Sequence, residues 1–409
     1  MHILWIKTEL LHPVDKGGRI RTYQMLRELC REHRVTYLAL DDGAGGPEAR
    51  ALASEYCHEL VTVPFRSRGK RTAGFYWELL CNLASPLPYA VAKYRSAALT
   101  RALERLVASH DIDVIVCDFL FPSLNVPDGL GVPVVLFQHN VEAAIWERHA
   151  QVAAHPVTRW YMREQWRRMR AFEGSECRRM DRVVAVSGED CRTLAAAYGI
   201  SRVDEVPTGV DTDYFRPTGT VTRNRNEIVF TGSMDWLPNE DAVAWFADRI
   251  LPRILAEVPD ARFTIVGRTP SEKVRALARA HEAISVTGSV PDVRPYMERA
   301  AAFVIPIRIA GGTRLKVYEA MGMEIPIVST TIGVEGLPVH DGTEVLIADE
   351  SDQFADAVVR VLRDPELGAR LARTAAERVR SEFGWREVAA RFGRICGTLA
   401  GSASVGAAV

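Results

Sequence analysis

Paired cysteines are missing from this chain: its seven cysteines lie singly along 409 residues, and no Cys-x-x-Cys motif occurs. An odd number of scattered cysteines argues against a disulfide framework or a zinc ribbon and predicts a reducing compartment. Long apolar runs are missing too, since no stretch approaches the roughly 18 residues that a membrane-spanning helix needs. The N-terminus has only a short apolar run before Lys7, unlike a signal peptide. We therefore expect a cytoplasmic protein, with peripheral contact to the inner face of a membrane left open.

An excess of charge of either sign is also absent, because 51 basic residues face 52 acidic ones. Nucleic-acid-binding proteins usually carry a net basic footprint, so we expect no nucleic-acid partner. The Gly-x-Gly-x-x-Gly fingerprint and the P-loop are both missing, which counts against dinucleotide binding and ATP hydrolysis. Asp211-x-Asp213 has the spacing of a possible metal pair, but no third ligand accompanies it, so we expect neither a metal nor another cofactor.

What the sequence does contain is a regular series of short apolar runs, each followed by a longer amphipathic segment. Continuous apolar runs are typical of strands buried on both faces, and alternation of strands with helices gives parallel sheets. We predict an α/β fold of two doubly wound, Rossmann-like domains that face each other across an inter-domain cleft. The predicted strands cover residues 2–6, 35–40, 60–63, 114–117, 134–137 and 183–186 in the first half, and 228–231, 263–266, 284–287, 303–305, 325–329 and 345–347 in the second.

Proline, glycine and polar residues mark the expected domain boundary. The stretch 206–226 contains several of them, and we interpret it as a linker. It separates an N-terminal domain over 1–205 from a C-terminal domain over 227–385. Residues 386–400 are expected to form a C-terminal helix that packs back on the N-terminal domain, and residues 401–409 a flexible tail.

The most informative local motif is IAGGTRLKVYEAM, residues 309–321. Glycines ahead of a helix leave free backbone N–H groups, which bind anions at the positive end of the helix dipole. With about 100° per residue, Gly312, Lys316 and Glu319 fall on one helical face. A diphosphate followed by a ribose diol would match that order. The alternative is a Lys–Glu pair on a solvated face, but the apolar neighbours of the pair favour a binding site.

Two further candidates follow predicted strands of the first half, where ligands of doubly wound domains bind. Gly17-Gly18 opens a helix expected to start near Arg19, and the two glycines let backbone N–H groups approach a ligand. His139, at the end of the strand 134–137, can hydrogen-bond a polar substrate. The alternatives are an ordinary turn and a structural histidine, and the residues alone leave both open.

Together these segments resemble the retaining, nucleotide-sugar-dependent glycosyltransferases of family GT4, which have the GT-B fold. The matching pieces are the Gly17-Gly18 loop, VVLFQHN, VVAVS, VPTGVDTDYF, FTGSMDWLPN, FTIVGR, ISVTGSVPDVRPYMERA and GGTRLKVYEAMGMEIPIVSTTIGVEGL. Their order and spacing carry the resemblance, which spans nearly the whole chain. Within the family, the sequence is most similar to bacterial surface-polysaccharide sugar transferases.

The resemblance implies a role for each matching residue. Glu319 would bind the ribose as the second glutamate of the family's E-x7-E motif. His139 would lie beside the donor sugar, while Arg314 and Lys316 would stabilise charge on the leaving diphosphate; these three are the implied catalytic residues. The other implied donor-binding residues are Gly17, Gly18, Gly232, Gly288, Val290, Gly312 and Thr313.

Two positions depart from the family pattern. Gly311 stands where the first glutamate of the E-x7-E motif, which contacts the donor sugar in the family, would fall. The usual basic residue soon after the first strand of the C-terminal domain is missing from FTGSMDW, so we expect Arg314 and Lys316 to supply the positive charge. These changes bear on the identity of the sugar more than on the reaction.

The resemblance therefore implies a metal-independent, retaining hexosyltransferase. It would move a sugar from a nucleoside diphosphate sugar to a hydroxyl acceptor in glycan, polysaccharide or glycolipid synthesis. Two alternatives remain: a sugar-nucleotide epimerase of the same fold, and a catalytically degenerate nucleotide-sugar-binding subunit.

A local concentration of basic residues points to the acceptor side. Residues 66–105 contain eight basic and two acidic side chains, interleaved with aromatic ones such as Tyr76 and Trp77. This composition suits an anionic membrane surface or a lipid-linked phosphate acceptor. The alternative is a core helix with a solvated basic rim.

Overall fold

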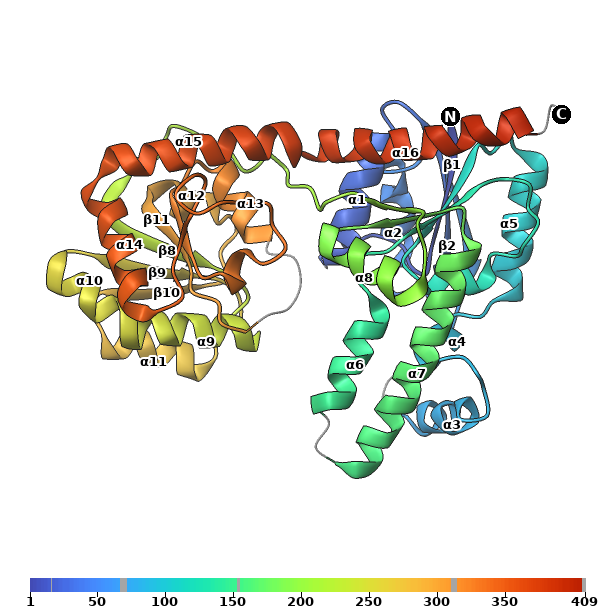
Figure 1. Ribbon diagram of the computed structural model, residues 1–409, viewed down its shortest axis with the longest axis horizontal. Coiled ribbons are helices and arrows are strands. Elements are labelled where there is room, and N and C mark those ends of the chain that lie inside the picture. The colour runs from blue at the N-terminus through green and yellow to red at the C-terminus, as the bar shows by residue number, and fades with distance from the viewer. Residues whose placement is uncertain (16, 67–71, 153–154, 310–314, 407–409) are drawn as a thin grey trace. The chain divides into compact units, whose positions relative to one another are not determined.

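The computed structural model describes residues 1–15, 17–66, 72–152, 155–309 and 315–406, which form two compact α/β units (Figure 1). The first unit comprises Met1–Pro207 and Val388–Val409, and the second comprises Thr208–Glu387. The chain therefore passes between the units twice, once after Pro207 and once within its last helix.

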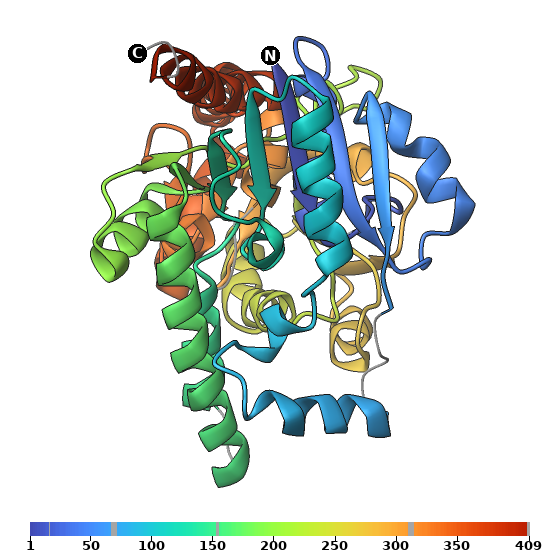
Figure 2. The same ribbon diagram turned by 90° about the vertical axis from the view of Figure 1, so that its right-hand side faces the viewer.

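The described strands of the first unit form one parallel seven-stranded sheet in the order β3-β2-β1-β4-β5-β6-β7. Every residue of β1 and β4 is buried, because helices cover both faces of the sheet (Figure 2). The strand order changes direction between β1 and β4, and ligands of doubly wound sheets bind beyond the carboxyl ends of such neighbours. The strands are β1 (His2–Lys7), β2 (Arg34–Asp41), β3 (Glu59–Pro64), β4 (Val114–Asp118), β5 (Val134–Phe137), β6 (Arg182–Ala185) and β7 (Val203–Glu205).

Helices α6 and α7 pack against each other and extend beyond the sheet, with α3 beside them (Figures 1 and 2). We call these three helices the arm; within it, Arg168 joins α7 to α3 by donating hydrogen bonds to the backbone oxygens of Asn82 and Leu83, at 2.7 and 2.9 Å. The helices of this unit are α1 (Gly17–Leu29), α2 (Gly46–Ala51), α3 (Ala73–Asn82), α4 (Tyr89–Ala92), α5 (Ala97–Ser109), α6 (Glu142–Val152), α7 (Pro156–Arg179) and α8 (Gly188–Tyr198), with short turns η1 (Leu52–Glu55) and η2 (Phe121–Asn125).

The described strands of the second unit form a parallel six-stranded sheet in the order β10-β9-β8-β11-β12-β13. Here the order changes direction between β8 and β11, which places the expected binding crevice at the loops after these two strands. The strands are β8 (Asn224–Thr231), β9 (Arg262–Val266), β10 (Ile284–Gly288), β11 (Ala300–Ile305), β12 (Ile327–Ser329) and β13 (Leu346–Ile347).

The last helix, α16, belongs to both units. Trp385 at its start packs against Gly209, and further along Phe392 packs between Trp5 and Phe137, with ring centroids 5.5 and 5.0 Å away. The helices after β8 are α9 (Leu237–Trp245), α10 (Leu251–Glu257), α11 (Glu272–Ala280), α12 (Arg294–Arg299), α13 (Leu315–Gly322), α14 (Ser351–Arg363), α15 (Pro365–Glu382) and α16 (Trp385–Gly406), with short turns η3 (Phe246–Ile250) and η4 (Ile332–Val334).

The predicted fold class, two doubly wound Rossmann-like units with parallel sheets, is confirmed. All twelve predicted strands are present, and the three-residue strand β7 was not predicted. No helix within the described residues is both long and apolar enough to cross a membrane.

Two expectations about segments differ from the structure. Within the expected linker, 206–226, residues 208–226 belong to the second unit, where Glu298 accepts hydrogen bonds from Thr218 Oγ1 and Gly219 N at 2.8 and 2.6 Å. Residues 401–406, expected to be part of a flexible tail, continue helix α16 despite two glycines.

Candidate functional site

The loops that follow β8 and β9 are held together at the carboxyl edge of the second sheet. Gly232 N donates to Val266 O at 3.0 Å, and Met234 N donates to Arg268 O at 2.9 Å. The approach is so close that a methyl group on Gly267 would come within 1.6 Å of Gly232 O. Glycine is therefore required at position 267, and the two loops form one rigid edge.

A cavity of about 430 Å³ opens at this edge. It brings together three of the residues implied by the resemblance, Gly232, Val290 and Glu319, which come from three different parts of the chain. The cavity is lined by Phe215, Thr231, Gly232, Ser233, Val266, Gly267, Arg268, Ser289, Val290, Val293 and Glu319.

Lys316 lies beside Gly232, although it is 84 residues further along the chain. Its Nζ donates a hydrogen bond to Asn239 Oδ1 at 2.9 Å and lies 4.2 Å from the centroid of the Phe230 ring. A methyl group on Gly232 would come within 3.0 Å of Lys316 Nζ. The ammonium group therefore lies at the end of β8, behind Gly232, which lines the cavity although Lys316 itself does not.

Glu319 is half-buried, three residues after Lys316 on helix α13. Burial raises the pKa of its carboxyl group to about 7, and the nearby charge of Lys316 opposes that shift. When ionised, a carboxylate in this place can accept two hydrogen bonds from the hydroxyls of a diol. The arrangement of a cation followed by a carboxylate is the one that the spacing of the motif predicts.

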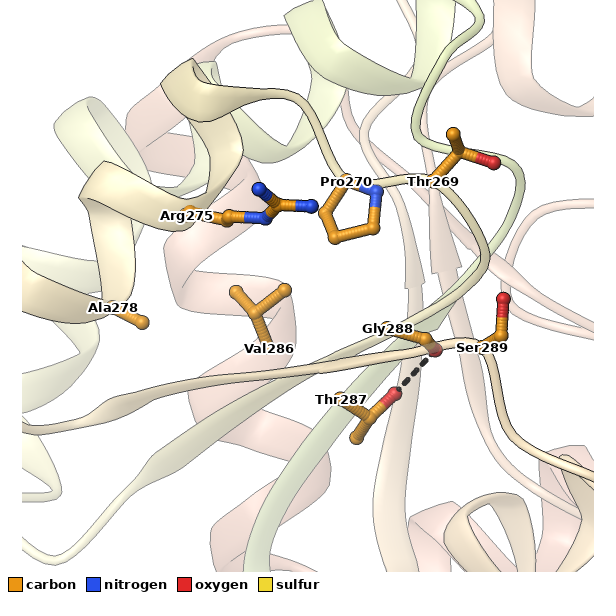
Figure 3. Close-up of a pocket in the computed structure, with 8 residues that line it drawn as sticks. All are labelled: Thr269, Pro270, Arg275, Ala278, Val286, Thr287, Gly288 and Ser289. Carbon is orange, nitrogen blue, oxygen red and sulfur yellow. Dashed lines mark hydrogen bonds between the residues drawn. The ribbon is translucent and has the colours of Figure 1, made fainter.

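A second cavity, of about 580 Å³, lies next to the first and shares Ser289 with it (Figure 3). Pro270 and Arg275 form one side, and the end of β10, including Gly288, forms the other. Gly288 therefore lines the second cavity, whereas Val290 lines the first. Gly312, Thr313 and Arg314, and Gly311 before them, lie outside the described residues.

His139 lies in the first unit, two residues after the end of β5, and is almost completely buried. Its ring stacks on Phe119, with centroids 3.8 Å apart, and its Nε2 lies 2.7 Å from Asp118 Oδ1. Burial lowers the pKa of His139 to about 3, although the charge of Asp118 acts in the opposite direction. The imidazole is therefore neutral, and among the described residues neither of its ring nitrogens has a hydrogen bond of good geometry, although Nε2 is in close contact with Asp118.

Asp118 connects His139 to the ends of two other strands. Its Oδ2 accepts hydrogen bonds from Lys7 Nζ at 2.7 Å, Thr22 Oγ1 at 2.6 Å and Trp5 Nε1 at 3.0 Å. Burial raises the pKa of Asp118, but the interactions with Lys7 and His139 together outweigh that effect and keep the pKa well below its usual range. Asp118 is consequently a buried, compensated anion that fixes the His139 ring.

Gly17 and Gly18 form the first turn of α1, which begins at Gly17 rather than near Arg19. A methyl group on Gly18 would come within 3.0 Å of the Phe119 ring, the ring that stacks on His139. A methyl group on Gly17 would have no atom within 4 Å. The Phe119 ring therefore lies between Gly18 and the His139 ring.

Several residues of these sites were not predicted from the sequence: Ser233, Asn239 and Arg268 in the second unit, and Lys7, Asp118 and Phe119 in the first. Lys7, Asp118, Phe119, Ser233 and Arg268 share one signal, because each ends a buried strand or lies within two residues of its end. A search for residues at or just after the ends of predicted strands would have found these five. It would also have found many loop residues that are not part of either site.

Profiles of two related families match the two units in turn. Residues 16–214 match "Glycosyltransferase Family 4", and residues 225–364 match "Glycosyl transferases group 1". The chain belongs to the family 4, group 1 glycosyltransferases and has the parallel α/β sheets of the GT-B fold.

Individual relatives are distant. The chain is 26% identical over 139 residues to an uncharacterized 44.6 kDa protein in the cps region of Klebsiella pneumoniae, covering 32% of this chain and 36% of that protein. It is 28% identical over 229 residues to the phosphatidyl-myo-inositol mannosyltransferase of Mycolicibacterium smegmatis, covering 54% and 58%. The chain thus spans about half the length, or less, of these two curated relatives.

Solved structures match over nearly the full length. Anabaena Alr3699/HepE in complex with UDP and glucose has a TM-score of 0.63 at 13% identity, covering 97% of this chain and all of that one. The sucrose-phosphate synthase of Thermosynechococcus elongatus has a TM-score of 0.66 at 14% identity, covering 98% and 100%. At these identities the likeness concerns the fold.

Proposed function

We propose that this protein transfers a sugar from a nucleoside diphosphate sugar to a hydroxyl acceptor, with retention at the anomeric carbon. The observation that carries the proposal is that Glu319 lines the cavity, while Lys316, one helical turn earlier, lies beside Gly232, another lining residue. An ammonium group followed by a carboxylate suits a diphosphate followed by a ribose. Membership of the glycosyltransferase family agrees with this assignment.

In the proposed reaction the second unit stabilises the leaving group. Lys316 faces charge that develops on the diphosphate as the glycosidic bond breaks, and such stabilisation acts most strongly in the transition state. Glu319 holds the ribose, while Gly232 and Val290 line its surroundings. Arg314, Gly312 and Thr313 keep the roles that the resemblance gives them, as part of this proposal.

The acceptor hydroxyl attacks the face that the diphosphate leaves, and its proton passes to a departing phosphate oxygen. His139 is proposed to lie beside the donor sugar, with Gly17 and Gly18 near the diphosphate. A neutral imidazole held by Asp118 can exchange hydrogen bonds with sugar hydroxyls without adding a charge. No step of this reaction requires a metal.

Thermal stability measured against a panel of nucleotide sugars tests the donor assignment. A ligand that binds only the folded protein stabilises it by about 2.7 kcal/mol at 100 times its Kd. We expect one base and sugar combination to raise Tm, and the Glu319→Ala variant to show a much smaller rise. An equal rise in that variant would remove the ribose role, and no rise for any nucleotide sugar would contradict the proposed donor.

We further propose that the acceptor is presented at an anionic membrane surface, on the cytoplasmic side. Five of the nine large apolar side chains that are exposed within the described residues lie on α3 and the first turn of α7. These five side chains are Tyr76, Trp77, Leu80, Val157 and Trp160. Exposed tryptophan and tyrosine beside arginines favour the interface of an anionic bilayer.

A further inference from the structure

The loop after β8 has no cation of its own. Residues 232–239, GSMDWLPN, contain one charged side chain, the acidic Asp235. A diphosphate that enters the cavity beside this loop loses water and needs positive charge or hydrogen-bond donors in its place. The compensating cations must therefore come from other elements.

Arg268 reaches this loop from the end of β9. Its Nε donates a hydrogen bond to Ser233 Oγ at 2.9 Å, and its backbone oxygen accepts one from Met234 N at 2.9 Å. Ser233 Oγ in turn donates to Asp235 Oδ1. Because both its backbone and its side chain are tied to the loop, the guanidinium group is fixed relative to Gly232.

The guanidinium group of Arg268 keeps its capacity to bind an anion. The side chain is exposed and lines the same cavity as Glu319. Within the part of the chain that the structure describes, no acidic side chain forms an ion pair with Arg268, and its terminal nitrogens donate no hydrogen bond. Four N–H groups in a planar fork remain, a geometry that matches two oxygens of a phosphate.

Lys316 is attached to the same loop through Asn239. Its Nζ donates to Asn239 Oδ1 at 2.9 Å, and Asn239 Nδ2 donates to Ser233 O, also at 2.9 Å. Ser233 is thus bonded to Arg268 by its side chain and to Asn239 by its backbone. Two cations from distant parts of the chain are held on one loop that carries a negative charge.

We propose that Arg268 binds the diphosphate of the nucleotide donor, with Lys316 as the second cation and Ser233 as the residue that positions the guanidinium group. This inference rests on the proposed function and adds to it the residue that recognises the phosphates. It explains how FTGSMDW can lack a basic residue, because the charge arrives from the neighbouring strand.

Calorimetric titration of the full chain with UDP, GDP and ADP, and with the corresponding nucleosides, tests the inference. For the diphosphate that binds best, Arg268→Gln should weaken affinity by about 10- to 100-fold, the range for hydrogen bonds to a charged group. Affinity for the nucleoside should change little. Arg268→Lys should restore part of the loss, since it returns the charge without the fork.

Arg262→Gln is the matched control. Arg262 is exposed at the opposite end of the same strand, and its substitution removes the same charge. It should leave diphosphate affinity unchanged. Ser233→Ala should weaken diphosphate binding less than Arg268→Gln does, and Ser233→Thr should recover it by returning the hydroxyl. Equal diphosphate affinity in Arg268→Gln and wild type would overturn this inference alone. Failure of the wild type to bind any of the three diphosphates would overturn the proposed function and this inference with it.

Discussion

Glu319 is the residue whose charge state matters most in the second unit. Burial shifts its pKa to about 7, so close to neutrality the free protein holds this carboxyl group in both forms. Ribose hydroxyls donate hydrogen bonds, and they favour the ionised form as acceptor. Nucleotide binding should therefore expel a proton from Glu319.

This linkage predicts a pH dependence of donor binding. As pH falls from about 8 to about 5.5, the affinity for a nucleotide sugar should decrease, by at most about tenfold per pH unit below the pKa of Glu319. The Glu319→Gln variant should bind about 1.5–3 kcal/mol more weakly at pH 8 and lose the dependence. Calorimetry in buffers of different ionisation enthalpy measures both the affinity and the released proton.

The pH dependence of folding stability in the unliganded protein serves as a control, because Glu319 should affect it in the direction opposite to donor affinity. Because the pKa of Glu319 is raised from 4.5 in the folded state, the folded protein holds more protons between pH 4.5 and about 7. The contribution of Glu319 to stability therefore declines as pH rises through that window. Glu319→Gln should make the decline shallower, while Glu142, whose pKa burial also raises to about 7, keeps its own part. Glu335→Gln, an exposed change of the same charge, should alter neither curve. A pH dependence of donor affinity that persists unchanged in Glu319→Gln would exclude this carboxyl group as its origin.

At the residue scale, short-range spacing could be predicted and long-range contact could not. The Lys316–Glu319 pair follows from helical periodicity within one motif. The contacts of Arg268 with Ser233, 35 positions apart, and of Lys7 with Asp118, 111 positions apart, depend on which strands become neighbours. The order of strands in a sheet depends on the whole sheet. The sequence therefore shows these residues but does not predict which of them contact each other.

Helix α3 exposes large apolar side chains that packing within the protein does not explain. Trp77 and Leu80 on it are 65% and 60% exposed, whereas Asn82 at its end is buried and joined to α7. Arg159, Arg163 and Arg167 are exposed along the first three turns of α7, and both elements lie in the arm that projects from the first sheet (Figures 1 and 2). The exposed side chains agree with a membrane-facing surface, while a core helix would have buried its aromatic residues.

Vesicle flotation tests this surface. The protein should float with anionic vesicles at about 50 mM salt, should remain unbound with neutral ones, and should dissociate at about 500 mM salt because exposed charge is screened. Changing Tyr76, Trp77 and Leu80 together to serine should abolish flotation by removing apolar area from the interface.

A matched variant separates this surface from general stickiness. Leu237, at the start of α9 in the second unit, is 64% exposed, so Leu237→Ser removes a comparable apolar side chain elsewhere. That variant should float like the wild type. Flotation that is unaffected by the three changes on α3, or that is equally weakened by Leu237→Ser, would show that α3 is not the membrane-facing element.

Elements with continuous apolar runs could be predicted, and those without them could not. The twelve predicted strands are fully or largely apolar, while β7 is three half-buried residues, Val203–Glu205, whose pattern does not differ from that of a loop. The final turns of α16 were also missed, because their small residues give no apolar periodicity. The start of α1 was placed late, since glycine favours turns in a sequence and yet opens this helix.

At the scale of the molecule, the two units have different proposed roles: the second binds the nucleotide, and the first contributes His139 and the membrane-facing surface. The second unit holds the cavity, the two cations and the carboxylate that suit a nucleoside diphosphate. The first holds a buried, neutral His139 fixed by Asp118, together with the exposed arm. Family membership could be predicted because motifs of both units occur in one order along the chain.

The most direct test of the central claim follows a radiolabelled sugar from the donor selected by thermal stability, with and without a panel of sugar- and lipid-linked hydroxyl acceptors. The account predicts acceptor-dependent release of the nucleoside diphosphate in the presence of EDTA, appearance of the label on the acceptor with its anomeric configuration retained, and a lower kcat in Lys316→Met. Conversion of the donor to a different nucleotide sugar without an acceptor would contradict the account in favour of an epimerase, and tight donor binding with no turnover on any acceptor would contradict it in favour of a binding subunit.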